Sequence, residues 1–164
     1  MAVRDDVVNT IAAFSLFADL NGPQLEEVAH LFDETFFGEG ERILRQGVSG
    51  SGFYIILEGT AAIRVNGVDR SSLKAGDYFG EISCLLGEVP IADIVAATPL
   101  RCLVLPGGQL EGFLTAHPKV MYRLLQGEAR KLKNTTKWLS YRKSPFPPVV
   151  INSCSWAVAP ADCN

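Results

Sequence analysis

One acidic side chain, Glu81, stands in a setting that favours binding of a small ligand. It follows Phe79 and Gly80 and precedes Ile82 and Ser83. A short helix beginning near Glu81 would direct free backbone N–H groups at a bound anion, and Gly80 would let the backbone approach a ligand closely. Glu81 would then be a carboxylate acceptor beside that anion. The helix dipole also favours an acid in the first turn without any ligand, so a purely structural role stays open.

The elements that would position Glu81 are mostly short strands. From Thr35 to about Leu105, short apolar runs alternate with glycine-bearing turns, which predicts a small barrel or roll. Asn66-Gly67 between two β-rich runs predicts a two-residue hairpin. Helical spacing of apolar residues predicts helices over 4–14 and 23–32 before the strands, and over 109–116 and Pro118 to about Tyr141 after them. The 164 residues suit one domain, mainly β with flanking helices.

Four segments in order resemble the cyclic-nucleotide-binding domain family, of the catabolite activator protein and protein kinase A regulatory subunit type. They are Phe14–Leu20, Phe37–Gly47, Phe53–Gly59 and Leu73–Ser83. The resemblance spans about residues 7 to 135. It implies a double-stranded β-helix, a jelly-roll-like β-roll with N-terminal helices and a long C-terminal helix. It also implies that Glu81 accepts the ribose 2′-hydroxyl of a cyclic nucleotide, cAMP or cGMP.

These observations divide the chain into four parts. We expect an N-terminal helical segment (1–34), a β-roll (35–106) whose phosphate-binding cassette covers 79–95, C-terminal helices (107–143) and a flexible tail (144–164). The tail begins with a proline-rich stretch that breaks the helix, and it carries one charge and no periodicity.

The chain departs from the family at the phosphate. The family continues Pro-Arg-(Ser/Thr/Ala)-Ala-(Thr/Ser)-Val, and its arginine grips the cyclic phosphate. Here Pro90 replaces that arginine in an ungapped alignment, and Ile91 replaces it if one residue is inserted. In the ungapped alignment Asp93 takes the Thr/Ser position, where its carboxylate would repel the phosphate of the ligand. The residues expected at the ligand are Phe79, Gly80, Glu81, Ile82, Ser83, Pro90, Ile91 and Ala92.

The loss of the guanidinium is chemically serious. No lysine or arginine lies between Lys74 and Arg101 to replace it locally. Hydrogen bonds to a charged group contribute about 1.5–3 kcal/mol each, and an arginine fork can make two. We therefore expect phosphate binding to be weaker by roughly ten- to a thousandfold, at tenfold per 1.4 kcal/mol.

Charge is distributed unevenly along the chain. Residues 1–118 carry 16 acidic and 7 basic residues, whereas residues 119–143 carry 8 basic residues and one acid, Glu128. A basic helix could contact nucleic acid or membrane, or it could be a solvated face that complements the acidic body.

Leucines recur every seven residues at 125, 132 and 139. They could form a homodimer through the 119–141 helix, but a coiled coil needs a second apolar position, where we find Glu128 and Thr135. The alternative is an apolar stripe on the roll.

Several functions lack the residues they need. The two histidines, His30 and His117, are far apart and lie outside the expected strands, which argues against a metal site, a cofactor or an enzyme. Two cysteines, Cys84 and Cys102, lie in apolar runs, where a buried thiol is the ordinary interpretation, and two lie in the tail. No apolar run could span a membrane, no signal peptide is evident, and no helix-turn-helix for DNA follows the long helix. We expect a cytoplasmic protein.

Two functions therefore remain. The first is a non-enzymatic cyclic-nucleotide-binding-type regulatory module whose ligand binding is weak or altered because the phosphate arginine is missing. The alternative is a degenerate, ligand-independent interaction or dimerisation module.

Overall fold

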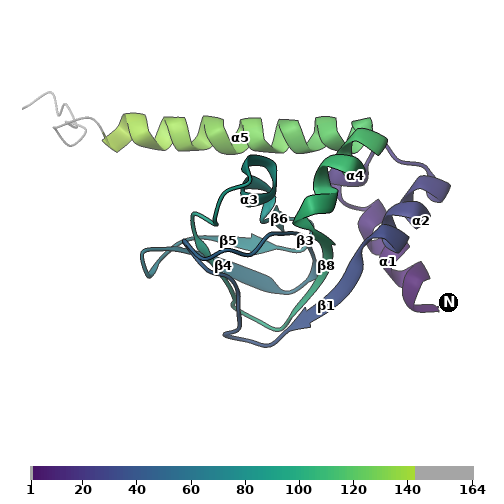
Figure 1. Cartoon of the computed structure of the whole chain (residues 1–164), viewed down its shortest axis with the longest axis horizontal. Helices are drawn as coiled ribbons and strands as arrows, with labels where there is room; N and C mark the ends of the chain where they lie inside the picture. The colour runs from purple at the N-terminus through teal and green to yellow at the C-terminus, as the bar shows by residue number, and fades with distance from the viewer. Residues whose placement is uncertain (1, 143–164) are drawn as a thin grey trace, which may run out of the picture. The chain divides into compact units, whose positions relative to one another are not determined.

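Eight short strands form two antiparallel four-stranded sheets, with helices on either side of them in the chain (Figure 1). The computed structural model describes residues 2–142. One sheet has the strand order β1-β8-β3-β6 and the other β2-β7-β4-β5. The strands are β1 (Asp33–Phe37), β2 (Arg42–Leu44), β3 (Gly52–Glu58), β4 (Thr60–Val65), β5 (Val68–Lys74), β6 (Tyr78–Phe79), β7 (Asp93–Ala96) and β8 (Leu100–Pro106). The predicted β-roll is confirmed.

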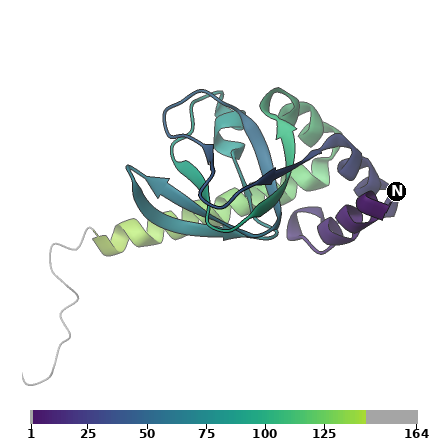
Figure 2. The ribbon, with the colours of Figure 1, turned by 90° about the horizontal axis from the view of Figure 1, so that it is seen from below.

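The helices also follow the predicted pattern, within two or three residues at each end. They are α1 (Ala2–Ala12), η1 (Ser15–Phe17), α2 (Gly22–Leu31), α3 (Glu81–Leu86), η2 (Gly107–Gln109), α4 (Leu110–Ala116) and α5 (Pro118–Arg142). Helix α2 begins at a capping box, in which Asn21 and Gln24 each accept a backbone N–H from the other. Helices α1 and α2 lie side by side at one end of the roll (Figure 2).

The predicted hairpin is confirmed between β4 and β5. Asn66 has a φ of 53° and Gly67 a φ of 77°, and positive φ at both central residues defines the type I′ turn that matches strand twist. The side chain of Gln46 holds this turn, because it donates to the Asn66 side chain and accepts the Asn66 backbone N–H.

Two apolar cores stabilise the roll. One lies between the two sheets, and the other lies between the β1-β8-β3-β6 sheet and the helices. The pleat of β3 feeds both cores, since Phe53, Ile55 and Leu57 enter the helical core and Ile56 enters the core between the sheets. Phe79 also enters the core between the sheets and so anchors the chain just before Glu81.

The chain divides into two units, residues 1–125 and 126–164. In the first unit, Val120 and Leu124 at the start of α5 are buried, and Arg123 makes two hydrogen bonds to the Asp19 carboxylate, of 2.7 and 3.0 Å. Leu125 is 62% exposed. We expected the stripe of leucines at 125, 132 and 139 to lie on the roll. This expectation is wrong at Leu125, because Val120 and Leu124, on the adjacent face of the helix, are the residues that enter the core.

The second unit is described as far as residue 142, and there it is a helix with exposed leucines at 132 and 139. The predicted flexible tail, 144–164, lies outside the described residues, as do its two cysteines.

Candidate functional site

The cassette begins at a position that only glycine can occupy. Gly80 has a φ of 83°, between β6 and α3. A Cβ built on it would lie 2.0 Å from the carbonyl oxygen of Gly52, far inside van der Waals contact. Gly80 therefore lets the chain turn sharply from Phe79 into α3, and Gly87, also at positive φ, ends the helix after two turns.

Glu81 is the first residue of α3, and it is only 4% exposed. Ser83 is also buried, and Phe79 stacks on Tyr54 with ring centroids 4.8 Å apart. Burying a carboxylate is costly unless it is paired. The first turn of α3 favours an acid at this position, so the burial of Glu81 is compatible both with a structural role and with a role at a ligand.

The other expected ligand residues lie in the segment between α3 and β7. Pro90 is buried, and its carbonyl oxygen accepts a 2.8 Å hydrogen bond from the backbone N–H of Gly47. Ile91 is 60% exposed, and Ala92 is partly buried. The Ile91 side chain thus points largely to solvent and does not fill the interior of the roll.

Asp93 has partners that sequence reasoning missed. Its carboxylate accepts a 2.7 Å hydrogen bond from the backbone N–H of Gln46 and lies 3.7 Å from Nε of Arg42. The link arises because β2 pairs with β7, with Arg42 opposite Val95. No local pattern shows this pairing. Since Arg42 and the Gln46 N–H balance the charge of Asp93, the carboxylate has a structural role in holding the turn after β2.

The two cysteines of the roll are poor nucleophiles. Burial raises the pKa of the Cys84 thiol, and the nearby Glu81 charge raises it further. Burial raises the pKa of Cys102 to about 12. Because the thiolate is the reactive form, both thiols are unreactive at neutral pH. Cys84 and Ser83 border a surface pocket of about 380 Å³ that also reaches the turn before β3, and Ser83 is the only expected ligand residue to line it.

Within residues 2–142, no three His, Cys, Asp or Glu side chains come together as metal ligands would. His30 lies in α2 and His117 follows α4, outside the strands as expected. None of the described helices is both long and apolar enough to cross a membrane.

The fold is thus a β-roll of two facing antiparallel sheets, with a helical layer packed on one of them and a short helix after a tight glycine turn. Residues 34–117 match the family described as the cyclic nucleotide-binding domain. Because the match covers half of the sequence, the chain belongs to this family. It is thus a cyclic-nucleotide-binding regulatory domain by family.

Individual relatives support the same assignment. The chain is 30% identical to the cGMP-dependent protein kinase egl-4 of Caenorhabditis briggsae over 105 residues, which are 60% of this chain and 14% of the kinase. It is similar to the catabolite activator protein of Thermus thermophilus, with a TM-score of 0.70 and 25% identity, over 77% of this chain and 62% of that protein. It also shares its fold with the regulatory subunit of a cAMP-independent protein kinase A from Trypanosoma brucei, with a TM-score of 0.67 and 22% identity, over 77% of this chain and 46% of that subunit.

Proposed function

We propose that this chain is a non-enzymatic regulatory module whose cassette binds a cyclic nucleotide, cAMP or cGMP, weakly or with altered selectivity. The observation that carries the proposal is the buried carboxylate of Glu81, placed behind a glycine that tolerates no side chain. Relatives differ in what their names state, since one is cGMP-dependent and another cAMP-independent. This chain covers a minor part of each, so the ligand has to be tested on the chain itself. The cytoplasmic location stays a prediction.

Weak binding follows from the phosphate side of the site. The family arginine falls on Pro90 or Ile91, and neither offers a charge. Pro90 is buried, and its carbonyl oxygen accepts a hydrogen bond from the backbone N–H of Gly47. Ile91, in contrast, is exposed. A ligand would keep hydrogen bonds to Glu81 and to the backbone but would lack the charge-assisted pair, so we expect binding to be roughly ten- to a thousandfold weaker than with the arginine present.

Calorimetric titration of the chain with cAMP and cGMP tests the proposal. We expect saturable binding in the submillimolar range and at least tenfold weaker binding for Glu81→Gln, since a neutral amide is a poorer acceptor for a ribose hydroxyl. The matched control is Glu26→Gln, an exposed acid of α2 outside the cassette, which should bind as the wild type does. An absence of heat at millimolar nucleotide would overturn the ligand proposal in favour of the ligand-independent module.

A second function is favoured by one observation, the exposed stripe of α5. The leucines at 125, 132 and 139 are exposed, and the positions four residues after the first two hold Ala129 and Thr136, which are also exposed. In this heptad frame, with the leucines at the d positions, the small residues Ala129 and Thr136 take the a positions of the seam. Glu128 and Thr135 enter the seam only in the other frame, with the leucines at the a positions. In a parallel pair, Glu128 would face Lys133 of the other copy, five residues on. We therefore propose that the chain forms a homodimer through this helix.

Sedimentation equilibrium at 5–200 µM tests the homodimer. We expect Leu132→Glu to give a monomer, because two charges would oppose each other in the seam. The matched control is Asn134→Glu, which adds the same charge half a turn away, on the other side of the helix, and should leave the dimer intact. A wild-type monomer at 200 µM would rule out this function.

A further inference from the structure

A row of three side chains crosses one end of the β1-β8-β3-β6 sheet. Phe36 of β1 lies opposite Arg101 of β8, and Arg101 lies opposite Glu58 of β3. Directly opposed residues of antiparallel strands project from the same face. The three side chains therefore share a face with Glu34, which is two residues before Phe36 on β1.

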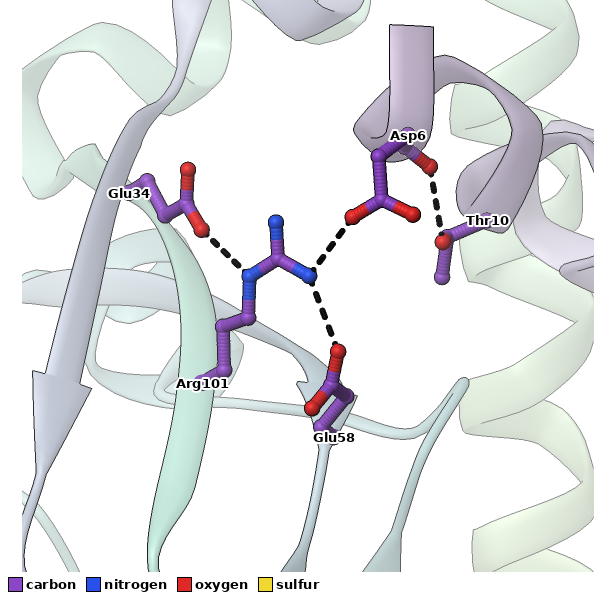
Figure 3. Close-up of polar contacts among 5 residues, drawn as sticks. All are labelled: Asp6, Thr10, Glu34, Glu58 and Arg101. Atoms are coloured by element: carbon purple, nitrogen blue, oxygen red, sulfur yellow. Dashed lines mark hydrogen bonds and ion pairs between the residues drawn. The ribbon is translucent and has the colours of Figure 1, made fainter. Parts of the chain in front are cut away.

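Arg101 is surrounded by carboxylates from three elements (Figure 3). Its Nε donates to Glu34, and its Nη1 donates to Asp6 of α1 at 2.8 Å and to Glu58 at 2.9 Å. These hydrogen bonds, above all the one to Glu34, raise the pKa of the guanidinium, which stays charged. Three carboxylates around one cation leave an excess of negative charge. The carboxylates of Asp6 and Glu58 are more than half exposed, so they can accept further donors from solvent.

Next to this charge the surface is apolar. Phe36 is 68% exposed, the largest exposed fraction among the phenylalanines of the described residues. It borders a groove of about 360 Å³ that is also lined by Glu58, Arg101, Pro99 and Leu100. In addition, β1 is the outer strand of its sheet, and within residues 2–142 no backbone group of 33–37 has a hydrogen bond outside the β1-β8 ladder.

We propose that this surface, the Phe36 face, binds an extended, arginine-bearing segment of a partner protein. The free edge of β1 offers backbone hydrogen bonds to an added strand. An arginine of that strand can stack on the Phe36 ring, and the excess of carboxylates around Arg101 attracts its charge. A negatively charged partner is disfavoured by the same excess of carboxylates. The Phe36 face is separate from the cassette, and the proposal stands without nucleotide binding.

Fluorescence anisotropy with a labelled pentapeptide that alternates valine and arginine tests the proposal, with a control peptide that has glutamine for arginine. We expect saturable binding of the arginine peptide that weakens as salt rises, and at least tenfold weaker binding of the control peptide. Phe36→Ser should weaken binding about tenfold, because the apolar and cation–π surface is lost. Glu58→Gln should weaken it about threefold or more, since it keeps a hydrogen bond to Arg101 but loses the charge.

Two matched substitutions separate this effect from general changes. Val68→Ser removes an exposed apolar side chain on β5, and Glu39→Gln removes an exposed acid; both should bind the arginine peptide as the wild type does. Equal binding of the two peptides, or unchanged binding by Phe36→Ser with an unchanged melting temperature, would overturn the proposal. Sedimentation that shows self-association lost in Phe36→Ser would also overturn it, because the occupant would then be a second copy of this chain.

Discussion

The substitution Ile91→Arg should restore affinity for a cyclic nucleotide without harming the fold. Ile91 is 60% exposed, and substitutions at exposed positions usually change stability by about 0.5 kcal/mol or less. An arginine here could make one or two charge-assisted hydrogen bonds to the cyclic phosphate. Because this side chain is partly solvated, each bond should contribute only about 1.5 kcal/mol, the lower end of the usual range, which gives about 1.5–3 kcal/mol in total. The expected gain in affinity for cAMP is therefore roughly 10- to 150-fold.

The alternative alignment makes a different prediction. Pro90→Arg would place a guanidinium at a buried position beside the carbonyl that accepts the Gly47 N–H. An unpaired buried charge costs about 3 kcal/mol or more, so this variant should melt well below the wild type. Ile91→Gln is the control for Ile91→Arg, because it adds polarity and donors but no charge, and it should gain less than about threefold.

Calorimetry with cAMP, at 50 and 300 mM salt, together with thermal unfolding of each variant, measures these effects. The reasoning is refuted if Ile91→Arg melts like the wild type and binds cAMP no more tightly, because an accessible arginine would then have no phosphate within reach. It is also refuted if Ile91→Gln gains as much as Ile91→Arg.

Three further predictions follow from the described geometry. Gly80→Ala should lower the free energy of unfolding by at least about 2 kcal/mol, measured in urea, because of its positive φ and the contact at 2.0 Å; Gly108→Ala, with nothing near its Cβ, is the control. Arg101→Met should destabilise the fold by about 2 kcal/mol at pH 7, because it leaves three carboxylates without their cation. With both tail cysteines replaced by serine, native protein at pH 7 should react slowly with a thiol reagent at Cys84 and not at Cys102 until it unfolds.

Local signals in the sequence predicted the elements well. The hairpin at Asn66-Gly67 was predictable because a two-residue turn of that composition imposes its own geometry. This feature depends on residues that are adjacent in the chain. Gly80 was expected only to let the backbone approach a ligand closely, and its contact with the carbonyl of Gly52, 28 residues earlier, was not predictable.

Contacts between distant segments were not predictable. Asp93 meets the backbone of Gln46, 47 residues earlier, and Arg101 meets Asp6, 95 residues earlier. Which carboxylate meets which donor depends on strand register, and periodicity carries no information about register between strands that are far apart in sequence. The misplaced leucine stripe has a related cause. Leu125 belongs to one apolar stripe and Val120 and Leu124 to another, and spacing alone does not show which of the two meets the core.

The two sides of the cassette can be separated by one combined experiment. If Glu81 holds the sugar and residue 91 faces the phosphate, the two act on different parts of one ligand. Glu81→Gln and Ile91→Arg should then change the binding free energy for cAMP additively, within about 0.5 kcal/mol, as distant sites do. A nonspecific gain from added positive charge would instead appear equally with linear AMP and would fall steeply with salt. If Ile91→Arg raises the affinity for cAMP alone, and if the gain persists when Glu81→Gln is also present, the cassette keeps a phosphate position and lacks only the cation. Equal gains in affinity for cAMP and AMP would show that the pocket no longer recognises the cyclic ligand.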